Sequence, residues 1–448
     1  MKNNFCKNLY ISLRNFLFEK DLVFARLLKN SSLLLFGNII AAILGLLVTA
    51  IRTRSLGSKN FGLLVLIITY VEIIGQFATF QSWQGLIKFG TEAIKLNHKE
   101  EFMGYVKLSF IIDGLCGFIG TAVAISVAYL FPKIFGLDHN TWFLAGVYCF
   151  SLLFDFSGMS LGVLRTLDYF KLITIHKIIS AAFKCFLMGF VFFYNGDIWS
   201  FIEFSLIGAV VDKLLLFLFA LFVLLKEGYI QYTNTKITNI KNFFKFSGWI
   251  YLSTTIDLPV QQFDVIIASF LVSLEAAGVY KVIKQVVQLL AMIADPIYQA
   301  IYPQFVSMIS NGDKENAIRY ARKIGILIFA LFFIPGSLFS ISSFYWFEPI
   351  FGKGFASGWM PLTILFIFKI VSISFIPIHP LFNALGYVRQ STKIIALANI
   401  SYFFIAIFLT QIWGVMGLIL AYGIQFLSVA GSKTLYLKRR NNFQHIVI

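Results

Sequence analysis

Long apolar stretches dominate this chain, and they constrain its fold more than any other feature. Hydrophobic residues make up 58% of the 448 residues and charged residues 13%, whereas about a quarter of a soluble domain is charged. A helix needs roughly 20 apolar residues to cross a bilayer. The sequence therefore predicts an all-α polytopic membrane protein with twelve transmembrane helices. The predicted spans are roughly 30–51, 61–87, 108–131, 141–164, 172–194, 199–225, 246–271, 279–305, 324–347, 360–385, 392–412 and 414–437.

The basic residues are sorted between alternate connections. Most of the 37 Lys and Arg residues lie in every second connection and near the two ends of the chain. Cytoplasmic loops carry an excess of such residues, so both termini are predicted to be cytoplasmic. Contact with anionic lipid headgroups accounts for the net charge of +16, and no nucleic acid partner is expected. Lys184, Lys213 and Lys369 break the pattern because they lie inside predicted spans.

Polar segments divide the chain into five parts. Residues 1–29 mix apolar and basic residues at helical spacing, which indicates a helix on the inner membrane surface or, alternatively, a mobile basic tail. The cytoplasmic linker 226–245 separates residues 30–225 from residues 246–437, and residues 438–448 form a cytoplasmic tail. Each half holds six predicted spans and starts from the cytoplasm. Such halves form two lobes related by a pseudo-two-fold axis along the membrane normal.

A weak internal repeat supports the division into halves. The segment LGSKNFGLL follows the first span, and VSLEAAGVY follows the seventh. In both segments a glycine comes five residues after a small residue, as Gly62 follows Gly57 and Gly278 follows Ser273. The two segments occupy corresponding places in the two halves.

Several classes of protein are disfavoured by the motifs that the sequence lacks. It has no GxxxxGK phosphate loop and no HExxH or paired-histidine spacing, so no cofactor and no metal site are predicted. Its connections are short, and the longest holds about 20 residues, which leaves no room for a catalytic domain. We therefore predict that the chain is not an enzyme and has no catalytic residues.

Six short motifs resemble a known family when they are taken together, in order and spacing. They are RSLGSKNFG, WQGLIKFG, GVLRTLDYF, YPQFVSMISNGDKENAIRYARKIG, FEPIFGKGFASGWMPL and FNALGYVRQS. This set is similar to that of the polysaccharide (O-antigen type) flippases of the MATE-like, or MOP, superfamily. The resemblance implies two six-helix lobes around a central cavity that opens alternately to each side of the bacterial plasma (inner) membrane. It also implies a polyprenyl-pyrophosphate-linked oligosaccharide as cargo, with a glycan polymerase or glycosyltransferases as possible partners.

Candidate cargo-binding residues are cationic, because Lys and Arg pair with phosphate oxygens. Lys184, Lys213 and Lys369 lie deep in predicted spans, where a charge is costly unless it is paired or faces water. The alternative role for each is a structural ion pair between helices. Arg52, Lys281 and Lys284 lie where the first and eighth spans meet the outer side. They are predicted to form a basic outer rim, or alternatively to contact lipid headgroups.

Acidic residues inside spans are candidates for coupling transport to protons or sodium. Asp257 and Asp295 lie beside Pro259 and Pro296, where carbonyl groups freed from helical bonding could help to bind a cation. Asp155 is a third candidate. The alternative role for all three is that of counter-ion to the buried lysines. A structural pair is also predicted between Arg165 and Asp168, which lie three residues apart.

Three other readings compete with the flippase. A MATE-type drug or cation antiporter would need a cavity with net negative charge, whereas lysines accompany the acidic residues here. A peptidoglycan-precursor flippase commonly has additional spans. A glycan polymerase or ligase would need a large external loop, and the predicted external loops are short.

Overall fold

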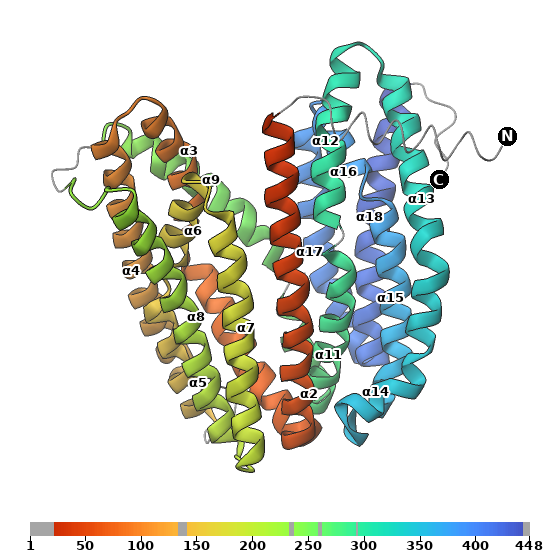
Figure 1. Ribbon diagram of the computed structural model, residues 1–448. Helices are drawn as coiled ribbons and strands as arrows, with labels where there is room; N and C mark the ends of the chain where they lie inside the picture. The colour runs from red at the N-terminus through yellow and green to blue at the C-terminus, as the bar shows by residue number, and fades with distance from the viewer. Residues whose placement is uncertain (1–21, 133–140, 233–236, 259–261, 293, 442–448) are drawn as a thin grey trace.

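The computed structural model describes residues 22–132, 141–232, 237–258, 262–292 and 294–441, and its long elements are all α-helices (Figure 1). Nine helices in these ranges are long and apolar enough to cross a membrane. The prediction of an all-α polytopic membrane protein is confirmed. The helices of the first half are α2 (Leu22–Ala78), α3 (Ser82–Lys95), α4 (Lys99–Leu130), α5 (Trp142–Cys149), η2 (Phe150–Phe154), α6 (Ser157–Thr166), α7 (Phe170–Phe193) and α8 (Ile198–Lys226).

The second half contains α9 (Ile240–Leu258), α10 (Asp264–Leu271), α11 (Leu274–Ala291), α12 (Ala294–Ser310), α13 (Lys314–Ile341), α14 (Ser343–Phe351), η4 (Lys353–Gly358), α15 (Trp359–Ser374), α16 (Ile378–Ala384), α17 (Val388–Trp413) and α18 (Val415–Asn441). The linker was predicted to end at residue 245, but α9 already begins at Ile240. Phe243 explains the earlier start, because its ring is fully buried and stacks on Tyr105 of α4 at 5.7 Å between ring centroids.

A glycine folds α2 into two legs. Gly57 has φ 68° and ψ 177°, a backbone conformation that residues with a Cβ atom rarely adopt. Residues 22–56 form the first leg, and residues 58–78 form the second. In Figure 1 the first leg (red) stands at the centre of the molecule, and the second leg returns into the bundle on the left. The two legs correspond to the first predicted span and to most of the second.

Several predicted spans are broken helices. The second was expected to run unbroken to residue 87, but α2 ends at Ala78 and Gln81 has φ 30° before α3 begins. The fourth is divided among α5, η2 and α6, and the tenth breaks at Pro377 between α15 and α16. A proline removes an amide donor and so accounts for the break in the tenth span.

Figure 1 shows two bundles on either side of the first leg of α2. One contains α3 to α8 together with the start of α9, and its apolar core includes Leu86, Tyr105 and Phe243. The other contains α11 to α18, and its core includes Val282, Phe366 and Tyr402. Taken as a whole, α2 packs most extensively against α7 and α11, so one helix connects the two bundles.

The bundles meet at the lower end in Figure 1, at a contact that we call the Gly62 junction. It joins residues 54–62 of α2 to residues 274–278 and 349–355. A Cβ atom on Gly62 would lie 1.9 Å from the carbonyl oxygen of Leu274, and one on Gly278 would lie 3.3 Å from the Cα atom of Gly62. The glycines of the sequence repeat therefore touch each other across the two halves.

Two of the quoted motifs meet in the same junction. Arg54 of RSLGSKNFG donates hydrogen bonds to the carbonyl groups of Ile350, at 3.1 Å, and Pro349, both within FEPIFGKGFASGWMPL. The rings of Phe61 and Phe355 pack edge to face at 5.7 Å between centroids, and both are buried. These contacts close the lower end, which the charge pattern assigns to the outer side of the membrane.

Candidate functional site

Two cavities lie on either side of the first leg of α2, about half-way along it. The N-side cavity, between α2, α6, α7 and α8, has a volume of about 480 Å³. The C-side cavity, between α2, α10, α11, α15 and α18, has a volume of about 730 Å³. Both are lined by Ala41 and Gly45 of α2. Their volumes are in the range of ~300–1,000 Å³ that is usual for small-molecule sites.

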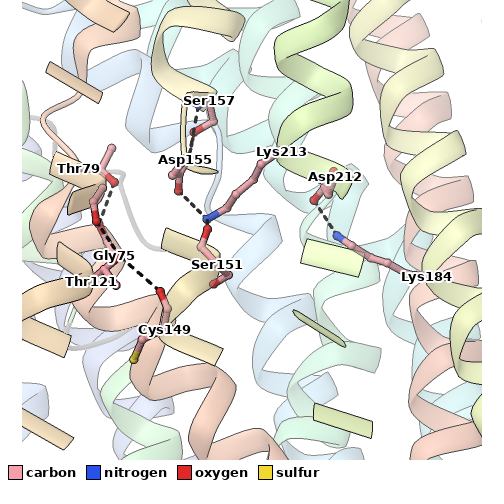
Figure 2. A network of polar contacts seen from close by, with 11 residues as sticks. Gly75, Thr79, Thr121, Cys149, Ser151, Asp155, Ser157, Lys184, Asp212 and Lys213 are labelled. Carbon is pink, nitrogen blue, oxygen red and sulfur yellow. Dashed lines mark hydrogen bonds and ion pairs between the residues drawn. The ribbon is translucent and has the colours of Figure 1, made fainter. Parts of the chain in front are cut away.

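An ion pair between neighbouring helices crosses the N-side cavity. Lys184 Nζ of α7 lies 2.7 Å from Asp212 Oδ2 of α8 (Figure 2). His176 Nε2, about two helical turns earlier on α7 than Lys184, lies 2.9 Å from Asp212 Oδ1. One carboxylate therefore holds two basic side chains, and its capacity to accept hydrogen bonds from a ligand is largely used.

Two further cations of the N-side cavity have neutral partners. Arg52 Nη2 donates to Ser205 Oγ at 2.7 Å, and its Nε atom faces Met188 Sδ at 3.3 Å. Lys177 Nζ donates to Asn38 Oδ1 at 2.6 Å. No carboxylate of the described residues lies within ion-pair distance of either cation. Their charges are therefore available to an anion.

The C-side cavity has its own buried ion pair. Asp264, in the first turn of α10, accepts hydrogen bonds from Lys284 Nζ at 2.6 Å and from Tyr280 Oη at 2.8 Å, both on α11. The Asp264 side chain is 2% exposed and that of Lys284 is 29% exposed. The lysine therefore reaches from the cavity into the protein to meet a carboxylate that is almost fully buried.

The other polar groups of the C-side cavity are cations, amides and phenols. Lys369 Nζ of α15 donates to Tyr422 Oη at 3.2 Å, and Lys281 lies 4.0 Å from Glu72. Three glutamines complete the polar lining, namely Gln262, Gln285 and Gln288. Gln285 Oε1 accepts a hydrogen bond from Thr49 of α2 at 2.7 Å, which fixes one amide across the boundary between the bundles.

Lys213 belongs to a different network, which Figure 2 shows beside the Lys184 pair. Its Nζ atom lies 3.0 Å from Asp155 Oδ2 and donates to the Ser151 carbonyl at 2.9 Å. Asp155 also accepts from the Ser157 hydroxyl at 2.6 Å. Lys213 therefore bonds a backbone carbonyl group and a carboxylate where the helix is broken between η2 and α6. It is not among the described residues that line either cavity. This geometry favours the alternative role, a structural ion pair.

Of the three proposed ion-coupling residues, the structure describes the side chain of Asp155 alone. Asp155 is the counter-ion of Lys213 and, with Asp113, lines a void of about 10 Å³. Asp257 lies in α9 and Asp295 in α12, but both side chains fall outside the described part of the chain. Among the described residues, no group of three or more His, Cys, Asp or Glu side chains could hold a metal ion.

The predicted pair between Arg165 and Asp168 is wrong. The guanidinium group of Arg165 stacks on the ring of Trp83 at 4.6 Å. Asp168 instead accepts a hydrogen bond from Asn30 at 2.9 Å. The reason is local, because α6 ends at Thr166 and Asp168 has φ 63°. The helical spacing on which the prediction depended is therefore absent.

Of the predicted cargo-binding residues, five line the two cavities. Arg52 and Lys184 line the N-side cavity, and Lys281, Lys284 and Lys369 line the C-side cavity. Sequence reasoning did not single out the carboxylates that organise them, Asp212 and Asp264, or the neutral groups around them. The spacing of Tyr280 and Lys284, four residues apart on α11, is the signal that could have indicated a shared partner.

Comparison with known proteins identifies the family. The family described as "Polysaccharide biosynthesis protein" matches residues 27–309. The chain belongs to this family. The matched residues run from α2 to α12 and include the whole lining of the N-side cavity and most of that of the C-side cavity. The family resemblance that the six motifs indicate is confirmed.

Individual relatives match to different extents. An Escherichia coli protein named "Inner membrane protein YghQ" is 31% identical over 157 residues, which are 35% of this chain and 44% of that protein. The chain thus matches less than half the length of this relative. A Shigella flexneri protein named "Putative O-antigen transporter" is 22% identical over 410 residues, or 89% of this chain and 94% of that protein.

The fold is shared with a solved transporter structure. A multidrug resistance MATE family transporter of the MOP superfamily, in an inward-facing conformation, superposes with a TM-score of 0.70. The two are 16% identical in sequence over 89% of this chain and 94% of that transporter. The family member described here therefore has the MOP fold. The proteins that share the fold are transporters and not enzymes, in agreement with the predicted class.

Proposed function

We propose that the protein is a flippase that moves a polyprenyl-diphosphate-linked oligosaccharide from the inner to the outer leaflet of the bacterial inner membrane. The observation that carries this proposal is the charge of the two cavities. Each is lined by three cationic residues and one carboxylate. A diphosphate cannot enter hydrocarbon without compensation, because an unpaired charge is very costly there. Cations whose partners are neutral, such as Arg52 and Lys369, can compensate it.

Membership of a polysaccharide biosynthesis family supports this cargo, and so does the name of the Shigella relative. The cationic lining argues against a drug or cation antiporter, whose cavity should carry a negative charge. Surface polysaccharide assembly would then place glycosyltransferases before the flippase and a glycan polymerase after it. Co-purification of the flippase with either enzyme tests direct binding between them.

The cavities suit transport by alternating access. They lie about half-way along the first leg of α2, and the Gly62 junction closes the end that is predicted to be external. We infer that the cavities receive cargo from the cytoplasmic side in this conformation. Release to the outer leaflet would require the junction to open, while the other ends of the bundles come together.

The membrane potential would favour outward movement of this cargo. Two negative charges that cross the full field gain about 5 kcal/mol per 100 mV. Protons or sodium would then reset the empty carrier. Asp155 is the coupling candidate whose contacts are described, and its proximity to Lys213 at 3.0 Å allows protonation to release that lysine.

Flipping in proteoliposomes tests the proposal. The purified protein should move the polyprenyl-diphosphate oligosaccharide fraction of its source bacterium between leaflets, faster when an imposed potential favours the outward movement of anions. Replacing both Arg52 and Lys369 by Gln should abolish the movement. Replacing Lys95, an exposed residue of α3, by Gln is the matched control and should leave it unchanged. Export of cationic drugs with no flipping of the glycolipid would instead support the antiporter.

A further inference from the structure

The two cavities have the same ratio of cations to carboxylates but different neutral polar groups. Apart from its charged residues, the N-side cavity offers one histidine and one serine, His176 and Ser180. The C-side cavity offers three glutamines and two tyrosines. This difference bears on what each cavity can recognise, because ammonium and guanidinium groups only donate hydrogen bonds whereas amides and phenols both donate and accept.

The N-side cavity is therefore a donor surface. Its carboxylate, Asp212, is already bound by Lys184 at 2.7 Å and by His176 at 2.9 Å. Arg52 and Lys177 add donors whose present partners are uncharged. A diphosphate has many acceptor oxygens and no donor, so it is complementary to a lining of this kind.

The C-side cavity offers donors and acceptors side by side. Gln288 is exposed to the cavity and Gln262 is half-buried, and neither has a hydrogen-bond partner among the described residues. Gln285 is fixed to Thr49 at 2.7 Å, and Tyr422 accepts from Lys369 at 3.2 Å. Sugar hydroxyl groups also donate and accept together, so this mixed lining fits them and not a diphosphate alone.

The wall between the cavities is built from small residues. Ala41 and Gly45 of α2 line both cavities, and Ala42 lines the C-side cavity. A Cβ atom on Gly45 would lie 3.3 Å from Gln285 Nε2. Because Ala41 and Gly45, the residues of α2 that both cavities share, present no large side chain, one elongated molecule can extend over the helix at this point and contact both sides.

We propose that the C-side cavity is an oligosaccharide-recognition site, in which the amides of Gln262 and Gln288 bind the sugar hydroxyl groups. The N-side cavity then holds the diphosphate of the same cargo. The inference rests on the proposed flippase function and adds the location of the sugar to it. Specificity for the glycan then lies in the second half of the chain, and affinity for the phosphate head lies in the first half.

Binding of two matched lipids separates the two roles. The probes are the polyprenyl-diphosphate oligosaccharide extracted from the source bacterium and the same polyprenyl diphosphate without sugars, each titrated into the full-length protein in nanodiscs. Replacing Gln262 and Gln288 together by Leu should weaken glycolipid binding about tenfold or more, since two hydrogen bonds are lost, and should leave binding of the sugar-free lipid unchanged. Arg52→Gln should weaken binding of both lipids by the same factor.

Two controls keep the outcome decisive. Gln231→Leu, in an exposed connection after α8, should change neither affinity. If the Leu pair does not reach the membrane, a Gln262→Met, Gln288→Met pair of closer shape replaces it. The proposed sugar site would be overturned if the glutamine variants lowered the affinity for both lipids equally, or lowered neither affinity. A wild-type protein that binds neither lipid would instead contradict the proposed function itself.

Discussion

The two cavities that flank the first leg of α2 are alike in charge and different in how that charge is held. Each has three cations and one carboxylate. The carboxylate of the N-side pair, Asp212, is 29% exposed, whereas that of the C-side pair, Asp264, is 2% exposed. A carboxylate at the cavity surface can exchange its partners for a ligand, but a buried one is committed to its lysine and tyrosine. The comparison indicates that Lys184 can leave its carboxylate for a ligand more easily than Lys284 can.

The largest expected effect concerns the closed end that both cavities share. A Cβ atom on Gly354 would lie 3.0 Å from that of Ser58, and the pair needs to separate by about half an ångström to reach disulfide geometry. With the native cysteines replaced by serine or alanine, Ser58→Cys with Gly354→Cys should form a disulfide under oxidation. Glycolipid flipping in proteoliposomes should then stop, and a reductant should restore it.

The cysteine-free protein under the same oxidant is the control. Undiminished flipping with a complete cross-link would show that the Gly62 junction does not need to open, and that cargo leaves the two cavities by another route.

The next effect sets one side of α2 against the other. Arg52→Gln removes a cation from the N-side cavity and should lower the flipping rate about 10- to 100-fold, since hydrogen bonds between charged groups contribute about 1.5–3 kcal/mol each. Lys369→Gln removes one from the C-side cavity and should lower the rate less than tenfold. Initial flipping rates of the two variants at equal reconstitution measure the difference. A greater loss for Lys369→Gln would reverse our placement of the diphosphate.

The two carboxylates should differ in their contribution to stability. Asp264→Asn leaves the ammonium group of Lys284 without its partner beside a buried site and should cost about 3 kcal/mol, because breaking a buried pair by removing one partner is strongly destabilising. Asp212→Asn should cost about 1 kcal/mol, because water at the partly exposed site screens Lys184. Thermal unfolding of each variant in the same detergent gives the comparison. Equal losses would mean that the difference in burial has no energetic consequence.

The smallest expected effect lies at the edge of the C-side cavity. Lys281 and Glu72 are 4.0 Å apart and their side chains are 30% and 44% exposed. An exposed pair of this kind contributes about 0–1 kcal/mol, so Glu72→Gln should shift the unfolding temperature by no more than a degree or two. If the shift matched that of Asp264→Asn, the edge of the cavity would be as important structurally as its buried pair.

The class of the fold, an all-α polytopic membrane protein, was predictable, because the length of the apolar stretches reports it directly. The repeat singled out Gly57, Gly62 and Gly278, but neither the turn of α2 at Gly57 nor the contact between the halves was predicted from it. The breaks near Gln81 and Asp155 were not predictable, since neither has a neighbouring proline and both depend on tertiary contacts. Partners such as Lys184 and Asp212 lie 28 residues apart, and no local period connects them. The neutral amides were missed because glutamine in a span has no distinctive spacing.

At the Gly62 junction the polypeptide backbones themselves are in contact, since the space between Gly62 and the Leu274 carbonyl oxygen excludes even a methyl group. Where backbone meets backbone, as at Gly62 and Leu274, the two surfaces can part and rejoin without rotamer changes at that point. An alanine at position 62 would act as a wedge far from either cavity. Such a protein would keep every residue that recognises cargo, but it would spend most of its time with its external end open.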